Sequence, residues 1–456
     1  MHRLRSVALG FALTTALTAP SVAAEQVPAI LAGHAYIPAM TMVPPPADAP
    51  RNAWISGKFA RGDRNDEPMT LMGKTGRLHG ERETGIRLPF LGQPLQGFSG
   101  FAMKPAADGS VYALIDNGFG SKVNSPDALL FFTRIQPDWA AGSVHVLETV
   151  FLHDPDRVIP FQLVNEATDE RYLTGGDFDP ESIQVVGDAV WIGEEFGPYL
   201  IRATLDGRVT GVFPTMLEGT ELRSPDHPRL RVPAVAGEDF VVPRSGGYEG
   251  MALTPDETRL WGMIEKPLLG ADGQPEGRFL RVLEFDPAAA EWTGNAFNYP
   301  LEEGATAIGD FNFIDDTRAL VIERDNGEGD PSLACADATA PQPDCFPHPA
   351  RFKRVYLIDT ASIDAEGFVQ KVAFVDLMDI EDPKGLARLE TAAAEGVMDG
   401  RFTLPFFTIE DVRMVDERHI MVGVDNNLPF SSGRALDRAA DNEFVLLEVP
   451  QLLQAR

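Results

Sequence analysis

Residues 179–195 read DPESIQVVGDAVWIGEE, and this stretch decides the fold class. Two short runs of mainly apolar residues flank a Gly-Asp turn at 187–188, and acidic residues stand at both outer ends. Such a pattern is typical of a β-hairpin. Glu181 begins the first strand, and Glu194 and Glu195 end the second, so these acids are expected to lie side by side at the open end of the hairpin.

The same order of parts recurs along the chain. The four other hairpins span residues 98–118, 248–266, 310–326 and 410–427. Further strands follow several of them, as in 279–285, 354–358 and 444–449. Units of about four strands in sequence are typical of propeller blades. We therefore predict an all-β fold and a β-propeller, with separate β-sandwich domains as the competing fold.

Six blades are the favoured number, and five or seven are the alternatives. Long inserted loops, such as 217–247 and 326–352, lengthen the spacing between hairpins. Residues 54–95 also contain strand-like runs. These residues are expected to supply a sixth blade or to complete the last one.

The N-terminus has the composition of a secretory signal peptide. Arg3 and Arg5 precede an uncharged apolar run, and small residues stand before a cleavage site near Ala24. The apolar run is short for the roughly 30 Å core of a bilayer, which disfavours a membrane anchor. We expect an exported protein, periplasmic or secreted. The expected divisions are a leader (1–24), an N-terminal extension (25–52) and the propeller domain (53–456).

The chain is strongly acidic, with 68 Asp and Glu residues against 39 Lys and Arg residues and a formal net charge of −29. Loss of the two leader arginines would take the net charge to −31. Such a surface repels nucleic acids and anionic lipids. We expect no nucleic acid partner, no membrane insertion and a monomer.

The two cysteines, Cys335 and Cys345, lie close together in a stretch rich in Pro, Asp and Ala. In an exported chain this spacing predicts a local disulfide. A zinc site is the alternative, but His348 is the only other candidate ligand nearby and a second ligand pair is missing.

Acidic or polar residues occupy corresponding ends of all five hairpins. The expected neighbours are Ser99 with Asp116, Glu181 with Glu194 or Glu195, Glu249 with Glu265, Asp310 with Glu323, and Glu410 or Asp411 with Asp425. If these are the inner hairpins of a propeller, their open ends form a ring of carboxylates at the mouth of the central channel. Clustered carboxylates raise one another's pKa or bind a cation. Ca²⁺, with about six to eight oxygen ligands, is the expected cation. The alternative is that these Asp and Asn residues only form turns.

Basic and aromatic residues accompany the acids. They are Lys122, Arg202, Lys266, Arg324 and Tyr199. Lys or Arg beside a metal site suits an anionic substrate such as a phosphate ester. Simple ion pairing with the adjacent acids is the alternative. The sequence shows no zinc-protease helix, Walker loop or dinucleotide fingerprint.

Four ordered motifs resemble one family. They are DNGFG (116–120), GGDFDPES (175–182), WIGEEFGPY (191–199) and GGYEGMA (246–252). Together they are similar to the phytase-like family described as having esterase-like activity of phytase, a group of exported bacterial proteins. The likeness spans roughly residues 97–450. It implies a propeller-like fold and hydrolysis of phosphate or carboxylic esters.

A hydrolase that needs no protein nucleophile is consistent with this resemblance. A cation polarises the ester and lowers the pKa of a bound water, an acid serves as general base, and basic residues hold the small anionic ester. The expected metal ligands are Glu181, Glu195, Glu249, Asp116 and Asp425. The expected catalytic bases are Glu265 and Glu323, and the expected substrate contacts are Lys122, Arg202, Lys266, Arg324 and Tyr199. A metal-dependent lactonase or sugar-ester hydrolase and a non-catalytic binding propeller are the alternatives.

Overall fold

The computed structural model describes residues 23–456 except 74–81, 231–232, 340–343, 389–396 and 399. The expected leader lies outside the described residues apart from its last two. Strands dominate the regular structure, which confirms the all-β prediction. The described helical segments are η1 (Arg51–Trp54), η2 (Pro331–Leu333) and α1 (Pro450–Gln454). None of these segments has the length and apolar content that crossing a bilayer requires.

Five sets of four hydrogen-bonded strands make up the body of the described chain, and each set is a propeller blade; the first and fifth sets are joined in one larger sheet through β12 and β2. Blade one contains β9 (Phe98–Phe101), β10 (Val111–Ile115), β11 (Phe131–Asp138) and β12 (Ser143–Phe151). Blade two contains β13 (Pro180–Val186), β14 (Ala189–Glu194), β15 (Tyr199–Thr204) and β16 (Val209–Pro214). Blade three contains β19 (Tyr248–Leu253), β20 (Leu260–Ile264), β21 (Phe279–Asp286) and β22 (Glu291–Pro300). Blade four contains β23 (Ala307–Phe313), β24 (Arg318–Arg324), β25 (Lys353–Ile363) and β26 (Val369–Asp376). Blade five contains β30 (Asp411–Met414), β31 (His419–Gly423), β32 (Asn442–Glu448) and β2 (Ala29–Ile37).

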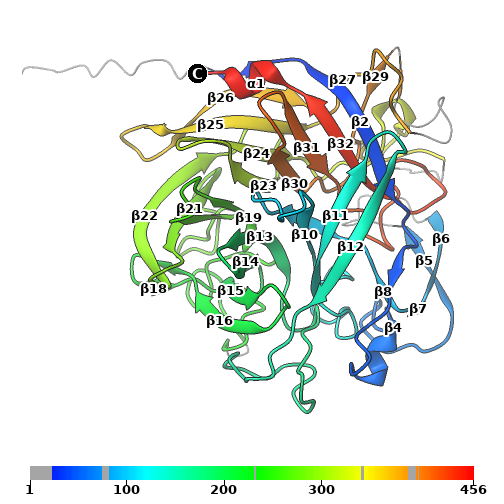
Figure 1. The fold of residues 1–456 in the computed structure, drawn as a ribbon, viewed down its shortest axis with the longest axis vertical. Helices are drawn as coiled ribbons and strands as arrows, with labels where there is room; N and C mark the ends of the chain where they lie inside the picture. The colour runs from blue at the N-terminus through cyan, green and yellow to red at the C-terminus, as the bar shows by residue number, and fades with distance from the viewer. Residues whose placement is uncertain (1–22, 74–81, 231–232, 340–343, 389–396, 399) are drawn as a thin grey trace, which may run out of the picture.

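The first strands of the five blades form a closed ring. Each of β9, β13, β19, β23 and β30 contacts the next, and β30 contacts β9. Figure 1 shows the sheets arranged around this ring. The described chain is therefore a five-bladed propeller. Five was one of the two alternative blade numbers, and the favoured number of six is wrong.

Residues 54–95 do not form a sixth blade because their described strands pair only in twos. The pairs are β3 (Met42–Val43) with β8 (Gln93–Pro94), β4 (Ile55–Ser56) with β7 (Phe90–Leu91), and β5 (Met69–Gly73) with β6 (Arg82–Leu88). Other short strands are β1 (Glu25–Gln26), β17 (Met216–Leu217), β18 (Thr220–Glu221), β27 (Ile380–Glu381), β28 (Val397–Met398) and β29 (Arg401–Phe402). β1 joins the outer edge of blade four, and β27 joins β2.

The N-terminal strand β2 closes the ring by completing blade five, where it runs antiparallel to β32. The propeller thus begins before residue 53, and the segment expected as an extension supplies an outer strand. Glu443 of β32 lies 3.1 Å from His34 of β2 and accepts two hydrogen bonds from Arg434, at 2.6 and 3.0 Å. The buried ion pair of Glu443 with Arg434 therefore contacts His34, which links the N-terminal strand to the C-terminal part of the chain.

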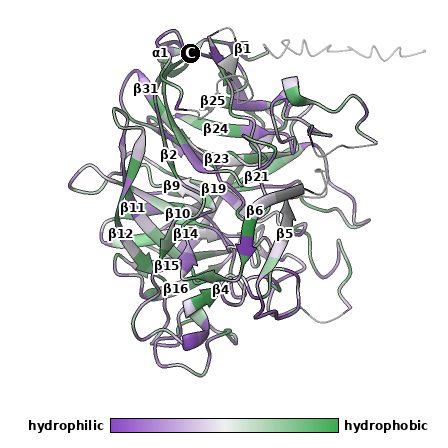
Figure 2. Cartoon of the chain, turned by 90° about the vertical axis from the view of Figure 1, so that its right-hand side faces the viewer, coloured by the Kyte–Doolittle hydropathy of each residue, from purple (hydrophilic) through white to green (hydrophobic). Residues whose placement is uncertain are grey.

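Apolar cores lie between adjacent blades. Ile183 and Ile192 of blade two, for example, pack in one cluster with Leu114 and Phe132 of blade one. Similar clusters join blades two and three, three and four, four and five, and five and one. Figure 2 shows apolar stretches mainly on the strands and polar ones over much of the loop surface.

Two buried amides link all five inner strands across the axis. Asn312 of β23 donates to the carbonyl oxygens of Val412 in β30 and Phe101 in β9, at 2.9 and 3.3 Å. Gln184 of β13 donates to Asn312 and to the Met251 carbonyl of β19, both at 2.7 Å. Buried polar groups satisfied in this way fix one register among the blades. They also occupy the middle of the channel.

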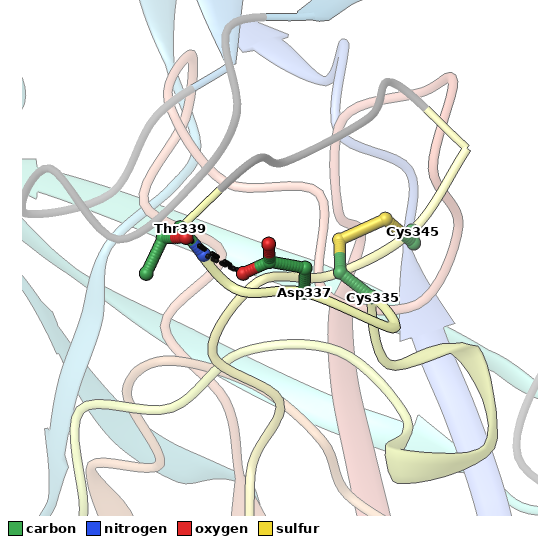
Figure 3. The surroundings of a disulfide bond; sticks show 4 residues. All are labelled: Cys335, Asp337, Thr339 and Cys345. Atoms are coloured by element: carbon green, nitrogen blue, oxygen red, sulfur yellow. Dashed lines mark hydrogen bonds between the residues drawn. A yellow bond between two sulfur atoms is a disulfide. The ribbon is translucent and has the colours of Figure 1, made fainter.

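The expected disulfide is confirmed. Cys335 and Cys345 are joined, with their Cα atoms 4.9 Å apart, in the long insertion of blade four (Figure 3). Next to the bridge, the Asp337 carboxylate accepts hydrogen bonds from the backbone N–H and the hydroxyl of Thr339, at 2.9 and 2.7 Å. Both interactions shape the loop, and neither requires a metal.

The substitution Gly309→Ala should destabilise the protein by about 3 kcal/mol, since overpacking costs this much where backbone cannot move away. A Cβ on Gly309 would lie 1.9 Å from the carbonyl oxygen of Ile409 in the next blade. Gly270→Ala is the control, because its Cβ would meet nothing closer than 3.4 Å. Urea unfolding of the two variants measures the difference. Equal stability would contradict the close approach of blades four and five.

The ion pair of Glu443 should make stability depend on pH in acid. Burial opposes the charge of Glu443, but Arg434 and His34 outweigh it and lower its pKa to about 2. Because the pKa is lower in the folded state, the pair stabilises the fold above the unfolded pKa near 4.3, and this contribution is lost as the pH falls toward 2. The stability advantage of the wild type over Glu443→Gln should shrink by about 3 kcal/mol between pH 6 and about 2. Parallel curves in urea unfolding would contradict the ionised pair.

Candidate metal and substrate site

Each inner hairpin has two positions at the mouth of the channel. One comes from the start of the inner strand, and the other comes from the end of the second strand. The backbone N–H of Glu195 donates to the backbone carbonyl of Asp179 at 3.0 Å, and that of Glu265 donates to the carbonyl of Gly247 at 2.7 Å. In each case the acid of the inner strand, Glu181 or Glu249, follows the accepting residue by two positions. Glu181 and Glu249 are the residues where the strand register shifts, so each stands in a β-bulge.

The same bulge sets the corresponding pair in blade four. Ala307 pairs with Arg324, and the register shifts between Ile308 and Phe311. This geometry puts Gly309 and Arg324 where other blades have acids. Counted in this way, the equivalent pairs are Ser99 and Asp116, Glu181 and Glu195, Glu249 and Glu265, Gly309 and Arg324, and Glu410 and Asp425.

A cavity of about 690 Å³ opens at this mouth. The acids in its wall are Asp116, Asp179, Glu181, Glu195, Glu249, Glu265, Glu410 and Asp425. Arg324 and Lys266 are the cationic side chains among the described lining residues. The structure thus brings together all five expected metal ligands, one of the two expected bases and two of the five expected substrate contacts. Their chemical roles remain predictions.

Two carboxylate clusters in the cavity share Glu195. Asp179, Glu181 and Glu195 offer oxygen atoms within 4.8 Å of one another, and so do Glu195, Glu249 and Glu265. All five residues are buried. Glu195 Oε1 and Asp179 Oδ1 are buried without a hydrogen-bond partner. Unpaired buried carboxylate oxygens are costly, and a cation coordinated by them removes that cost.

Burial and mutual repulsion disfavour the ionised forms of these acids. Burial is the larger cause and neighbouring carboxylates the second, and together they hold the pKa values of Glu181, Glu195 and Glu249 well above the usual range. Burial also raises the pKa of Asp179, to about 6, against the effect of its hydrogen bonds. The metal-free cluster therefore retains protons that a bound cation would displace.

Arg324 is the main positive charge of the site. Its guanidinium contacts Glu410 at 3.0 Å, Glu265 at 3.3 Å and Glu249 at 3.4 Å. Burial opposes its charge, but the three carboxylates outweigh it and raise the pKa of Arg324 further. Lys266 lies 2.8 Å from Glu265. Glu265 therefore lies between both cations.

The structure does not support Glu323 as a catalytic base. Its fully buried carboxylate forms an ion pair with Lys371 and accepts a hydrogen bond from the Glu302 N–H at 3.3 Å. Its expected neighbour Asp310 instead accepts from the N–H groups of Phe311 and Val412, at 2.7 and 2.8 Å. The bulge in β23 shifts the register, so both side chains point away from the cavity.

Three expected substrate contacts do not line the cavity. Arg202 lies farther along blade two, where its guanidinium packs over Trp191 and Phe213 at 5.8 Å from each ring centroid. The Tyr199 hydroxyl is hydrogen bonded to His227 at 2.8 Å. Lys122 lies beside the mouth and donates to the Asp226 carbonyl at 3.3 Å. The first two follow mouth acids in sequence, but β15 carries them outward.

Asp116 and Asp425 line the cavity but belong to neither cluster. Asp116 Oδ1 accepts hydrogen bonds from the Gly118 N–H and the Gln96 amide, at 2.7 and 3.0 Å. Asp425 accepts from the Asn427 N–H at 2.6 Å and the Thr408 hydroxyl at 3.0 Å. The alternative that such acids only form turns therefore holds in part for these two residues, because their oxygens accept hydrogen bonds within the loops.

Sequence reasoning assigned no chemical role to two cavity acids, of which Glu410 was expected in the carboxylate ring and Asp179 was not. Asp179 completes the first cluster, and Glu410 is the nearest partner of Arg324. The sequence contains a signal for each of these two acids. Asp179 precedes Glu181 by two residues, and Glu410 starts its unit at the position that Glu181 and Glu249 hold in theirs.

Fold and site define a propeller with a carboxylate-lined cavity at one mouth. A family model described as "Phytase-like: Esterase-like activity of phytase" matches residues 93–428. The chain therefore belongs to this phytase-like family. None of the curated proteins matches it.

Solved structures that match the chain share low sequence identity with it. An aldose sugar dehydrogenase of Streptomyces coelicolor in its PQQ-bound form is 12% identical, with a TM-score of 0.35 over 84% of this chain and 99% of that chain. Regucalcin of Agrobacterium tumefaciens, a calcium-binding protein, is 9% identical, with a TM-score of 0.34 over 78% and 92%. Glutaminyl cyclase of Myxococcus xanthus is 10% identical, with a TM-score of 0.33 over 78% and 91%. Likenesses of this degree carry no argument about function.

Replacing Arg324 with Met should lower the free energy of unfolding by about 3–5 kcal/mol in the presence of a chelator, because three buried carboxylates lose their counterion. Arg324→Lys, which keeps the charge, should recover part of this loss. Urea unfolding of both variants measures the effect. A methionine variant as stable as the wild type would show that the carboxylates do not depend on Arg324.

Proposed function

We propose that this protein is an exported, metal-dependent hydrolase of phosphate esters. The pair of clusters that share Glu195, next to Arg324, carries this proposal. Membership of a family described by esterase-like activity of phytase supports it. The site combines ligands for a cation with fixed positive charge for an anion.

The residues present suit a hard divalent cation such as Ca²⁺. Every side chain of the two clusters offers carboxylate oxygen, the donor type that Ca²⁺ prefers. The orphaned oxygens of Asp179 and Glu195 are buried in one cluster. Asp179, Glu181, Glu195 and Glu249 would hold the cation. A bound cation supplies Lewis acidity toward a phosphoryl oxygen and toward water.

The remaining side chains of the site have distinct tasks in this proposal. Arg324 and Lys266 hold the phosphate oxygens. Glu265 accepts a proton from the attacking water while the water oxygen bonds to phosphorus and the P–O bond to the organic group breaks. The released alkoxide takes a proton from solvent. Contact with both Arg324 and Lys266 fixes the Glu265 carboxylate beside the phosphate position.

The variant Glu195→Gln tests the proposal because Glu195 belongs to both clusters. For the wild type, saturating Ca²⁺ should add about 3 kcal/mol of stability at roughly 100 times its Kd, seen as a higher Tm. It should also support turnover of nitrophenyl phosphate that a chelator abolishes. Glu195→Gln should lose the Tm rise and at least about 99% of kcat, an effect typical of lost catalytic electrostatics.

The matched control is Glu284→Gln, since Glu284 is a buried acid of β21 far from the mouth whose carboxylate accepts from Thr293 and Asn295, both at 2.6 Å. It should keep both properties. A phosphodiester, a lactone and nitrophenyl acetate complete the substrate panel. Turnover of the lactone or the acetate alone would replace the phosphate proposal. No turnover and no Ca²⁺ effect would leave a binding propeller.

A further inference from the structure

The cavity has a second wall, which the carboxylates do not form. Phe119, Phe407 and Phe430 line it together with Ala60. Phe119 is buried, whereas Phe407 and Phe430 are only partly buried and present ring surface to the cavity. Aromatic walls beside a few charged groups are typical of sites for small organic molecules.

One of these aromatic residues, Phe407, lies beside the cationic side chain of Arg324. The ring centroid of Phe407 lies 5.8 Å from the Arg324 guanidinium carbon. On the other side, a Cβ placed on Gly120 would lie 3.9 Å from the ring of Phe430. A ligand whose anionic group contacts Arg324 would therefore place its adjoining organic group beside Phe407, in a cavity that Phe430 also lines.

Hydrogen bonds fix the backbone that carries both partly buried rings. The buried Lys353 donates to the backbone carbonyl of Phe407 at 3.0 Å and to that of Asp325, next to Arg324, at 2.7 Å. The N–H of Phe430 donates to the Asn427 carbonyl at 2.7 Å. One lysine thus couples the aromatic wall to the anion-holding side chain.

The charges of the cavity disfavour a polyanion. The described lining residues include eight acids and two basic side chains, Arg324 and Lys266. Even two divalent cations in the carboxylate clusters would leave no excess positive charge when the acids are ionised. Each phosphate group beyond the one held by Arg324 and a bound cation would add to this repulsion, so a ligand with a single phosphate is favoured over a polyanion.

We propose that the ligand is a monoester with one phosphate group and an apolar organic group of aromatic size, which lies against Phe407 and Phe430. This inference rests on the proposed function for the phosphate and adds the class of the organic group. The aromatic wall selects the organic group, and the carboxylate clusters with Arg324 select the phosphate.

Calorimetric titrations in saturating Ca²⁺ test the inference independently of turnover. The probes are phenylphosphonate, methylphosphonate and inositol hexakisphosphate. Phenylphosphonate should bind at least about tenfold more tightly than methylphosphonate, since an aromatic contact contributes on the order of 1.4 kcal/mol. Inositol hexakisphosphate should bind more weakly than phenylphosphonate. Phe407→Ala and Phe430→Ala should each reduce the preference for the phenyl group while the Ca²⁺-induced Tm rise persists.

Phe368→Ala is the matched control, because Phe368 is a partly buried ring that packs edge-on against Phe279, 5.4 Å away and outside the cavity. It should leave the phenyl preference unchanged. Equal affinity for the two phosphonates, a preference that survives both cavity variants, or tighter binding of inositol hexakisphosphate would overturn the inference. Selective phenylphosphonate binding without hydrolysis of any phosphate ester would contradict the hydrolase and leave the ligand class standing.

Discussion

The burial of like charges around one channel mouth is the constraint on which the site depends. Eight carboxylates line one cavity, and Arg324 contacts three of them. Removing carboxylates from water costs several kcal/mol each unless protons, cations or hydrogen bonds compensate. The structure uses hydrogen bonds for Asp116 and Asp425, an ion pair for Glu410, and leaves oxygens of Asp179 and Glu195 unpaired. The unpaired oxygens mark where a cation could bind.

The propeller keeps these charges in place through contacts away from the mouth. Asn312 and Gln184 connect all five inner strands, and the contact of Glu443 with His34 links β2 to the C-terminal strands. Neither set of contacts depends on the cavity acids. The apolar cores between the blades therefore stabilise the ring despite the repulsion among the acids at its mouth.

Local patterns were sufficient to predict the hairpins and most of the mouth acids. Strand, turn and strand follow one another within about 20 residues, so the open ends can be found without knowledge of the fold. The pair in blade four was misplaced by one residue. Arg324 lines the cavity in place of Glu323, and Gly309 holds the position expected for Asp310, because β23 has the same bulge as β13 and β19. The residue pattern alone does not reveal this pairing register. The same is true of Arg202, whose strand leads outward, and of β2, whose partner lies at the other end of the chain.

Blade four differs from the other blades because it places a cationic side chain at the mouth. Blades one, two, three and five supply acids or a serine at the two mouth positions, whereas blade four supplies Gly309 and Arg324. The carboxylate clusters lie on blades two and three, and Arg324 of blade four contacts Glu249 and Glu265 of blade three, so cation ligands and fixed positive charge adjoin in one cavity. A symmetric ring of acids would bind cations alone. Breaking the symmetry at one blade adds a counter-charge for an anion, and the Phe407 ring beside Arg324 extends that asymmetry to the organic part of a ligand.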